Sequence, residues 1–513
     1  MRTLVACAEA SRLDAATQAE SALQPLLLME DAAVALWREL APLAAVRKAG
    51  SESDGGGFLL ALCGGGNNGG DALALLRLAR FSGLSRIAAI TAKAPGELAS
   101  IHAASLRKLG VPVLDWSIDK EACKSFIAEA RLIIDGLSGT GLLGPLRENA
   151  ASLLAAANAV VLAGKAKIAS IDLPSGLSDV YASGWPIARA SWTLSIEPRK
   201  ACLYYPAVRD SVGEILPIEG VFPRDAEVAR AASLLEAADL KTLAPMPPES
   251  TYKGTRGKVA VFAGSIGTSG AAALSSRAAL AAGAGIVSLF ASDELYPIVA
   301  PMLEAVMVKR EPEHLGELCS KYDAILVGSG WGRSAKRSKQ LAALLETGIP
   351  AVLDADAIAL YRGLLDSGFK TMSPIIFTPH PGEFFALSGI ESRIALASPA
   401  TILGEVAKSL GSTVILKSNV TWIAGSSGEL AVWDGNEAGL GTAGSGDVLA
   451  GLVAGLLARL ATDSPAQRSF DAARAAVIAH GLAGRTLRAR CGWFESGALR
   501  EEAARILGAT SGV

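Results

Sequence analysis

One pattern recurs along both halves of the chain: a short apolar run, a glycine-rich turn, and then an Ala- and Leu-rich amphipathic segment. Apolar runs that alternate with helices in this way are typical of parallel β-sheets covered by helices on both faces. The pattern predicts strands at 58–62, 132–134, 168–171, 259–262, 324–327, 351–353, 375–377 and 414–416. Because ligands bind beyond the carboxyl ends of such strands, we expect functional residues in the turns that follow them.

A break in composition separates the two halves. It contains Pro223-Arg224-Asp225, an Ala-rich piece, and then Pro245-Met246-Pro247-Pro248. Proline restricts its own backbone and that of the preceding residue, so the second cluster is typical of a stiff linker. We therefore predict two three-layer αβα domains, at 1–222 and 250–513, joined by a Pro-rich linker at 223–249. One continuous domain with a Pro-rich excursion is less favoured for a chain of 513 residues.

Composition excludes several classes of partner and location. With 48 basic and 50 acidic side chains the net charge is -2, which argues against nucleic acid or an anionic membrane as the main partner. The most apolar stretch, 448–458, is far shorter than the roughly 20 residues of a membrane span. The six cysteines form no Cys-x-x-Cys pair and the four histidines show no zinc-ligand spacing. We expect reduced thiols and a cytoplasmic protein.

Three acid-bearing turns follow strands of the first half. The first, 64–71, reads Gly-Gly-Gly-Asn-Asn-Gly-Gly-Asp and precedes a predicted helix at 72–80. It suits pyrophosphate binding at a helix N-terminus, although a simple helix cap by Asp71 would read similarly. The others, 135–141 and 172–176, read Asp-Gly-Leu-Ser-Gly-Thr-Gly and Asp-Leu-Pro-Ser-Gly. Each is a common turn composition alone, but together they place Asp71, Asp135 and Asp172 along one sheet edge.

The side chains of these turns suggest a cation and an acid/base group. Uncharged oxygens from Asn68 and Ser175, with one carboxylate, suit a monovalent cation better than zinc. A carboxylate that does not bind this cation, Asp172 by preference, can act as a general acid/base.

With these three motifs in order, the first half resembles the NAD(P)H-hydrate epimerase domain, whose fold is Rossmann-like. The resemblance implies interconversion of the R and S epimers at C6 of hydrated NADH or NADPH (NADHX and NADPHX), with Asp172 as acid/base. It implies a potassium ion held by Asn68, Asp135 and Ser175. It implies substrate contacts at Asn67, Asn68, Gly69, Gly70, Asp71, Gly139, Thr140, Gly141, Leu142, Leu143, Gly144, Pro145 and Asp172. One departure is Ala72, where the family usually has Gly, and its methyl group could crowd the loop.

The second half carries a glycine-rich loop, Gly-Thr-Ala-Gly-Ser-Gly-Asp at 441–447, which runs into a predicted helix at 448–460. Amides at the helix start would hold phosphate oxygens, and Asp447 could take a proton from an attacking hydroxyl. A capped helix after a flexible loop is the alternative. The loop has no Gly-Lys-Ser/Thr end, so it is not a P-loop.

Four further turns follow strands of this half, at 264–271, 328–332, 354–357 and 378–383. The last contains His380 between two prolines. A lone histidine is more often structural, but its place beside three other turns makes a substrate contact plausible.

Over 252–507 this half resembles the ribokinase-like family, and within it the ADP/ATP-dependent NAD(P)H-hydrate dehydratase. The resemblance implies that the C6 hydroxyl of the S-hydrate is phosphorylated and phosphate is then eliminated, with ADP as the expected co-substrate and Mg²⁺ accompanying phosphoryl transfer. Asp447 is the expected catalytic residue. Implied hydrate contacts are Ala271, Gly332, His380 and Asp447, and implied nucleotide contacts are Lys417, Ser418, Asn419, Val420, Thr421, Gly444, Ser445 and Gly446.

Departures from this family concern Tyr252, Ser329, Trp331, Lys417-Ser418-Asn419 and Ala443. Ala443 would cost of order 1 kcal/mol if its position needs a positive φ. The leading hypothesis is a bifunctional repair enzyme for hydrated nicotinamide cofactors. The rivals are a kinase for a vitamin precursor and a first half that only binds a ligand. A homo-oligomer is expected, since Ala- and Gly-rich helices allow close packing.

Overall fold

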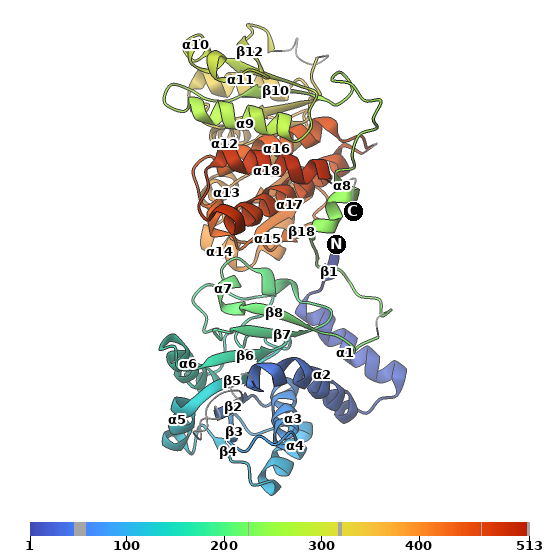
Figure 1. The fold of residues 1–513 in the computed structure, drawn as a ribbon, viewed down its shortest axis with the longest axis vertical. Helices are drawn as coiled ribbons and strands as arrows, with labels where there is room; N and C mark the ends of the chain where they lie inside the picture. Colours follow the sequence, from blue (N-terminus) through green and yellow to red (C-terminus); the bar gives the residue numbers. More distant parts are fainter. Residues whose placement is uncertain (46–57, 224, 316–320, 463, 510–513) are drawn as a thin grey trace. The chain divides into compact units, whose positions relative to one another are not determined.

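The computed structural model describes residues 1–45, 58–223, 225–315, 321–462 and 464–509. The chain divides into two units (Figure 1). The N-terminal unit is Thr3–Ala231, and the C-terminal unit is Met1–Arg2 with Ala232–Val513. Each unit is built around its own sheet.

The N-terminal unit contains a seven-stranded sheet in which every strand pair is parallel. Its order is β4-β3-β2-β5-β6-β7-β8. Counted from β2, the first six strands have the order 3-2-1-4-5-6 of a doubly wound dinucleotide-binding fold. The strands are β2 (Phe58–Cys63), β3 (Ile87–Thr91), β4 (Val113–Asp115), β5 (Ala130–Gly136), β6 (Lys167–Ile171), β7 (Trp192–Ile196) and β8 (Glu214–Ile218). The Rossmann-like prediction is confirmed by this order.

Helices cover both faces of this sheet. Alternate residues of β2 point to opposite faces: Leu59 and Ala61 join one core, while Leu60 and Leu62 join the other. The first core includes α2 (Pro25–Ala45), α3 (Asn67–Phe81) and α4 (Glu97–Lys108), and the second includes α5 (Lys120–Glu129) and α6 (Glu148–Leu162). Figure 1 shows the two sets on opposite sides of the strands. The remaining helices are α1 (Cys7–Ser21), α7 (Arg209–Val212) and the 3₁₀ turn η1 (Ala201–Tyr204).

The C-terminal unit contains an eleven-stranded sheet of order β1-β9-β18-β17-β16-β15-β14-β13-β10-β11-β12. Pairing is parallel from β12 to β16 and antiparallel where β17 joins β16 and β18. The strands are β1 (Arg2–Leu4), β9 (Ala232–Leu234), β10 (Lys258–Phe262), β11 (Ile286–Ala291), β12 (Met307–Arg310), β13 (Ala324–Val327), β14 (Ala351–Leu353), β15 (Ile375–Phe377), β16 (Thr413–Leu416), β17 (Thr421–Ala424) and β18 (Leu430–Trp433).

One face of the larger sheet is covered by α9 (Ser269–Ala281), α16 (Ser445–Arg459), α17 (Pro465–Cys491) and α18 (Ser496–Gly508), which share its main core. On the other face, Tyr361 of α12 (Asp356–Asp366) packs against Phe377 of β15, with ring centroids 5.1 Å apart. Further helices are α8 (Leu240–Leu243), α10 (Tyr296–Val299), α11 (Ala335–Leu345), α13 (Pro381–Ser388), α14 (Ser392–Ala397) and α15 (Pro399–Leu410).

Each of the eight apolar runs that predict strands lies within a strand. The fold class, α/β with helices on parallel sheets, is therefore confirmed. The side chains of these runs are buried on both faces, which is why they read as continuous rather than alternating.

The seam between the units differs from the predicted linker at 223–249. Ala232–Leu234 forms β9, which pairs with β18, and the buried Leu240 and Leu243 of α8 belong to the core of the C-terminal unit. A three-residue strand and a one-turn helix are too short to produce a periodic signal, so composition alone marked the whole stretch as a linker.

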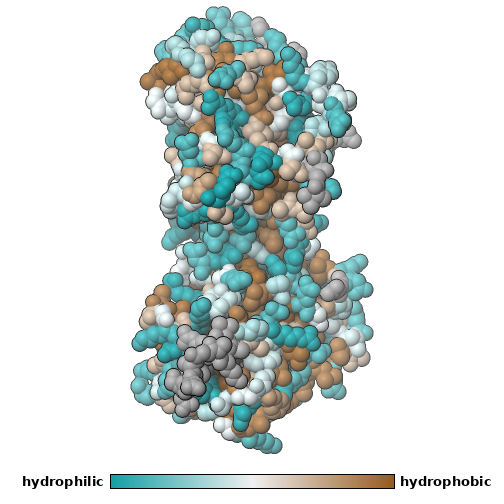
Figure 2. Space-filling view, in the orientation of Figure 1, coloured by the Kyte–Doolittle hydropathy of each residue, from teal (hydrophilic) through white to brown (hydrophobic). Residues whose placement is uncertain are grey.

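Across the part of the chain that the structure describes, no helix combines the length and apolarity needed to cross a membrane. Figure 2 shows hydrophilic side chains spread over the visible face of both units.

The contact between α16 and α9 yields a stability prediction. A Cβ at Gly451 would lie 2.2 Å from the carbonyl oxygen of Ser275, so Gly451→Ala forces the two helices apart. We expect a loss of about 1–3 kcal/mol in the free energy of unfolding. The matched control is Gly363→Ala in α12, where a Cβ meets nothing within 4 Å.

Gly363→Ala should be neutral or stabilising by up to about 1 kcal/mol, because alanine is the better helix former. Thermal and urea unfolding of the full chain measure both variants. Equal effects of the two substitutions would contradict the close packing of α16 on α9.

Candidate active sites

A cavity of about 1000 Å³ opens in the N-terminal unit at the carboxyl ends of β2, β5 and β6. It lies at the switch point of the strand order, between β2 and β5, where open α/β sheets bind ligands. Its lining includes all three predicted turns and residues of α1 and α2. Site residues in this lining are Asn67, Asn68, Gly69, Asp71, Gly139, Thr140, Gly141, Leu142 and Asp172. Of the predicted substrate contacts, Gly70, Leu143, Gly144 and Pro145 are not in it.

The Asn-Asn-Gly-Gly-Asp segment is the start of a helix rather than a loop before one. Helix α3 begins at Asn67, with Gly66 as its cap. The predicted start at residue 72 and the alternative role of Asp71 as helix cap are therefore both wrong. Glycine is required here for close approach, since a Cβ at Gly69 would lie 2.1 Å from the oxygen of Gly64.

Ala72 does not crowd the pocket. Its methyl group lies in the core, where it fills the space left by Gly136: a Cβ added at Gly136 would meet it at 2.8 Å. The departure from the family pattern therefore changes core packing and leaves the pocket lining intact.

Asp172 is held by a buried lysine. Its Oδ1 accepts from Lys200 Nζ at 2.5 Å and from the backbone N–H of Ile196 at 3.0 Å. Lys200 is 1% exposed and also donates to the carbonyl of Ile196 at 2.8 Å. Asp172 has a φ of 64°, a conformation that costs a non-glycine residue about 1–2 kcal/mol and that clusters at functional sites.

Lys200 lies in the pocket lining and was missed by sequence reasoning. Nothing in the run Arg199-Lys200-Ala201-Cys202 distinguishes a buried lysine from an exposed one. Its partner is 28 residues away and is brought to it only by the pairing of β6 with β7.

Asp71 is the second pocket carboxyl group. Burial raises its pKa well above the ordinary value, and the nearby charges of Asp172 and Asp14 raise it further. The pocket thus places an ion-paired carboxylate near a carboxyl group that favours its proton. Such a pair suits a reaction in which one group accepts a proton and another donates one.

The three predicted potassium ligands converge below this pocket. Asn68 Nδ2 donates to the carbonyls of Ser138 and Ile171 at 2.8 and 3.0 Å, and Ser175 Oγ accepts from Ser138 N at 2.9 Å. Asp135 is fully buried, and its Oδ2 accepts from Ser170 Oγ and Ser175 N. Burial raises its pKa, while these hydrogen bonds oppose the rise.

This arrangement fits a monovalent cation. A side-chain amide can present either its oxygen or its nitrogen, so a rotated Asn68 would complete an all-oxygen set with the carbonyls and Ser175. A cation there would also offset the charge of Asp135, which accepts hydrogen bonds from the neutral donors Ser170 Oγ, Ser175 N and Leu137 N.

In the C-terminal unit, the glycine-rich loop leads directly into a helix N-terminus. Helix α16 begins at Ser445, three residues before the predicted start, so Gly446 and Asp447 lie in its first turn. Gly444 takes the positive φ of 86°, and Ala443 is not among the residues with positive φ. The cost considered for Ala443 therefore does not arise.

Asp447 lies beside a network of charged groups. Asp354 is 2% exposed and accepts from Lys417 Nζ at 3.0 Å, Thr378 Oγ1 at 2.6 Å and Ser329 Oγ at 3.0 Å. Burial and the charge of Asp354 raise the pKa of Asp447 to about 6, against the opposing effects of Lys417 and Ser329. A carboxylate with such a pKa is close to the optimum for a general base near neutral pH.

Lys417 also lies beside the glycine-rich loop, since a Cβ at Gly446 would be 3.4 Å from its Nζ. It also lies 3.9 Å from Glu383 Oε2. Of the other predicted nucleotide contacts, Ser418 Oγ donates to Asn419 Oδ1, Val420 is buried, and Thr421 begins β17.

His380 has a structural role in this structure. Its Nδ1 caps α13 by accepting from Gly382 N and Glu383 N at 3.0 and 3.3 Å, and its side chain is 57% exposed. The predicted hydrate contact stays a prediction. Of the other two predicted hydrate contacts, Ala271 lies beside the 328–332 turn, since a Cβ at Gly330 would lie 3.2 Å from its Cβ, and Gly332 N donates to Asp356 Oδ2 at 2.8 Å. Both also stay predictions.

His480 is a further residue that sequence reasoning missed. It is buried on α17, with Nε2 3.1 Å from both Oγ and the carbonyl oxygen of Ser445. Burial lowers the pKa of His480 to about 4, so its ring is neutral at neutral pH and contacts Ser445 of the glycine-rich loop without adding charge. A single histidine in a helical pattern carried no signal of this contact.

Known proteins resemble both units in sequence. A family model described as NAD(P)H-hydrate dehydratase matches residues 259–506, and one described as YjeF-related protein N-terminus matches 26–202. A bifunctional NAD(P)H-hydrate repair enzyme of Gloeobacter violaceus is 32% identical over 95% of this chain and 94% of its own. One of Mycobacterium leprae is 31% identical over 88% and 89%.

The chain belongs to the bifunctional NAD(P)H-hydrate repair enzymes.

Solved structures resemble the C-terminal unit of this repair enzyme. An ADP/ATP-dependent NAD(P)H-hydrate dehydratase from Bacillus subtilis, co-crystallised with ATP/Mg²⁺, is 24% identical, with a TM-score of 0.48 over 55% of this chain and 100% of its own. A ribokinase-like superfamily protein from Enterococcus faecalis is 24% identical, with a TM-score of 0.49 over 56% and 99%. Neither score reaches 0.5, so membership of the family rests on the sequence comparisons.

The ion pair between Lys200 and Asp172 leads to a stability prediction. Lys200→Met leaves Asp172 buried without its cation, and should lower the free energy of unfolding by about 3–5 kcal/mol. The exposed Lys165→Met is the matched control, expected within about 0.5 kcal/mol of the wild type.

Adding Asp172→Asn to Lys200→Met removes the unpaired charge and should recover part of that loss. Urea unfolding of the four proteins forms a double-mutant cycle. A double variant as unstable as the sum of the two single variants would show that the pair is not coupled.

Proposed function

We propose that the C-terminal unit dehydrates the S epimer of NADHX or NADPHX in a nucleotide-dependent reaction, and that the N-terminal unit interconverts the R and S epimers at C6. The observation that supports this most is the occurrence, in one chain, of two sites at motifs of the family: a cavity with Asp71, and a helix N-terminus with Asp447. The pKa of both aspartates is raised. A dehydratase that accepts only the S epimer would leave the R epimer unrepaired. Epimerisation by the N-terminal unit would convert that R epimer into substrate for the C-terminal unit.

In the proposed dehydration, Asp447 accepts the proton of the C6 hydroxyl as this oxygen attacks the terminal phosphoryl group. The amide of Gly446 at the start of α16 holds phosphate oxygens, and the nearby Lys417 Nζ neutralises their charge. Phosphate then leaves C6 while the neighbouring ring carbon loses a proton to solvent, which restores the ring double bond of the reduced nicotinamide, so one phosphate leaves for each hydrate repaired.

ADP is the proposed co-substrate, with ATP as the second choice. Mg²⁺ would offset phosphate charge during transfer, and it favours carboxylates together with substrate phosphates as ligands. Asp354 and Glu383, on either side of Lys417, are the carboxylates that fit this role.

In the proposed epimerisation, Asp172 accepts or returns the proton, and Lys200 fixes its orientation. Asp71, which favours its proton, is placed to donate to the substrate across the same pocket. A potassium ion held by Asn68, Asp135 and Ser175 would fix the second and third turns below the substrate.

The deciding experiment is recovery of NADH from a mixture of both NADHX epimers with ADP, ATP or neither, in the presence of potassium and Mg²⁺. We expect nearly complete recovery with nucleotide by the wild type. Asp172→Asn should stop at the S fraction, and Asp447→Asn should recover none, because each removes the proton acceptor of one unit.

Each of these two isosteric variants is the control for the other, because Asp172→Asn leaves the C-terminal unit unchanged and Asp447→Asn leaves the N-terminal unit unchanged. No recovery by the wild type with either nucleotide would contradict the dehydratase assignment and favour kinase substrates. Full recovery by Asp172→Asn would contradict its acid/base role.

The pKa of Asp447 predicts a pH profile for dehydration. Its ionised form is the base, so kcat/KM for S-NADHX should fall about tenfold per unit as pH drops below about 6, and level off above 7. Because Ser329 lowers the pKa of Asp447, Ser329→Ala should move the midpoint to higher pH.

The matched control is Ser288→Ala, which removes a buried hydroxyl on β11. It should leave the midpoint unchanged. A profile without an acid limb, or one that Ser329→Ala does not move, would contradict the role of Asp447 as base.

A further inference from the structure

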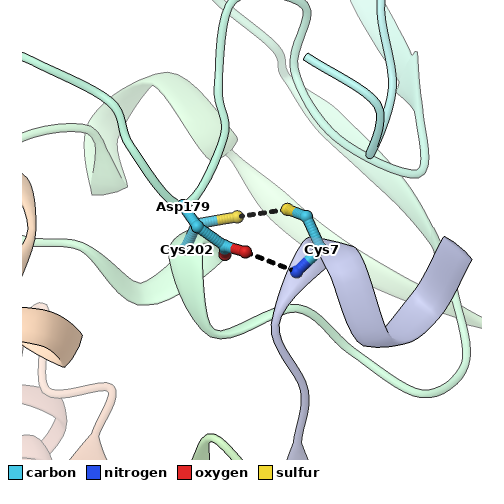
Figure 3. A group of neighbouring side chains, drawn as sticks. All are labelled: Cys7, Asp179 and Cys202. Atoms are coloured by element: carbon cyan, nitrogen blue, oxygen red, sulfur yellow. Dashed lines mark hydrogen bonds between the residues drawn. The ribbon is translucent and has the colours of Figure 1, made fainter. Parts of the chain in front are cut away.

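Three side chains with metal-ligating atoms meet in the N-terminal unit outside the pocket lining. They come from separate segments: Cys7 is the first residue of α1, Cys202 lies in η1, and Asp179 follows the third turn. The two Sγ atoms are 3.7 Å apart, and Asp179 Oδ2 accepts from Cys7 N at 2.6 Å. Figure 3 shows the two thiols pointing toward each other and the Asp179 carboxylate pointing toward the backbone nitrogen of Cys7. The ligand atoms of the three residues all lie within 4.8 Å of one another.

The spacing of the thiols matches a shared metal better than a disulfide. Two thiolates on one tetrahedral zinc lie about 3.8 Å apart, given Zn–S bonds of about 2.3 Å. A disulfide needs its sulfurs about 2.05 Å apart. Cys7 is 3% exposed and Cys202 is not exposed at all, so both are held in place by packing.

We propose that Cys7, Asp179 and Cys202 form a site for a thiophilic divalent cation of the zinc type. Two sulfurs and one carboxylate oxygen are a ligand set that zinc accepts, with a water molecule as the fourth ligand. Asp179 has two carboxylate oxygens, so one can keep its hydrogen bond with Cys7 N while the other binds the ion.

Binding is a ligand exchange without electron transfer. Two S–H bonds break, two metal–sulfur bonds form, and two protons leave to solvent. Because protons leave on binding, the affinity must increase as pH rises.

The site joins two walls of the pocket. Helix α1 continues from Cys7 to Ser11, Asp14 and Gln18, which line the cavity. On the other side, Cys202 is two residues after Lys200, which holds Asp172. A bound ion therefore fixes α1 to the segment that positions the proposed acid/base. The site itself does not depend on the proposed epimerisation.

The test uses the full chain, reduced and freed of metal with a chelator, and titrated with Co²⁺ and then Zn²⁺. We expect one equivalent of Co²⁺ with a thiolate-to-metal absorption band, displaced by Zn²⁺, and release of two protons per ion. Cys202→Ser should abolish the band, and Asp179→Asn should weaken binding about 10- to 100-fold.

The matched control is Cys123→Ala, which removes another buried thiol of the same unit and should bind as the wild type does. Absence of the band in the reduced wild type overturns the proposal without any variant. An unchanged band in folded Cys202→Ser overturns it as well. Loss of both thiols to a Cys7–Cys202 disulfide under reducing conditions would equally overturn it.

Discussion

An aspartate–lysine pair, with the aspartate buried, stands directly after a parallel strand in each unit. In the N-terminal unit Asp172 follows β6 and is held by Lys200, and in the C-terminal unit Asp354 follows β14 and is held by Lys417. A carboxylate taken out of water without a partner would be strongly destabilising, so each lysine is what allows an acidic group at this depth. The rest of each site is arranged around this pair.

The aspartate of each pair raises the pKa of a second aspartate nearby. The charge of Asp172 adds to burial in raising the pKa of Asp71, and the charge of Asp354 does the same for Asp447. One carboxyl group of each site is thus paired with a cation, while burial and the neighbouring carboxylate raise the pKa of the second. In the N-terminal unit this arrangement suits a proton acceptor, Asp172, beside a proton donor, Asp71, whereas in the C-terminal unit the raised pKa of Asp447 suits a general base.

Backbone geometry at the sheet edges supports these groups. Asp172, directly after β6, has a positive φ of 64°, and Ala355, two residues after the end of β14, has a positive φ of 45°. Such conformations persist where the surrounding contacts outweigh the strain. At the same edges, glycines such as Gly69 allow backbone segments to approach more closely than any side chain would permit.

Sequence by itself determined the α/β class, eight of the strands, and the turns in which the sites lie. These features are local: a run buried on both faces must be apolar, and a close backbone approach requires glycine. Asp71, Asp172 and Asp447 could be named from such turns. The linker was placed too broadly, because β9 becomes a strand only by pairing with β18.

Only the tertiary structure decided which side chains meet. Lys200 is 28 residues from Asp172, His480 is 35 from Ser445, Lys417 is 63 from Asp354, and Cys202 is 195 from Cys7. No periodicity or motif records these pairs, since the residues between them form strands and helices of their own. Proximity across strands and helices sets burial and charge, and these in turn set the chemistry of each group.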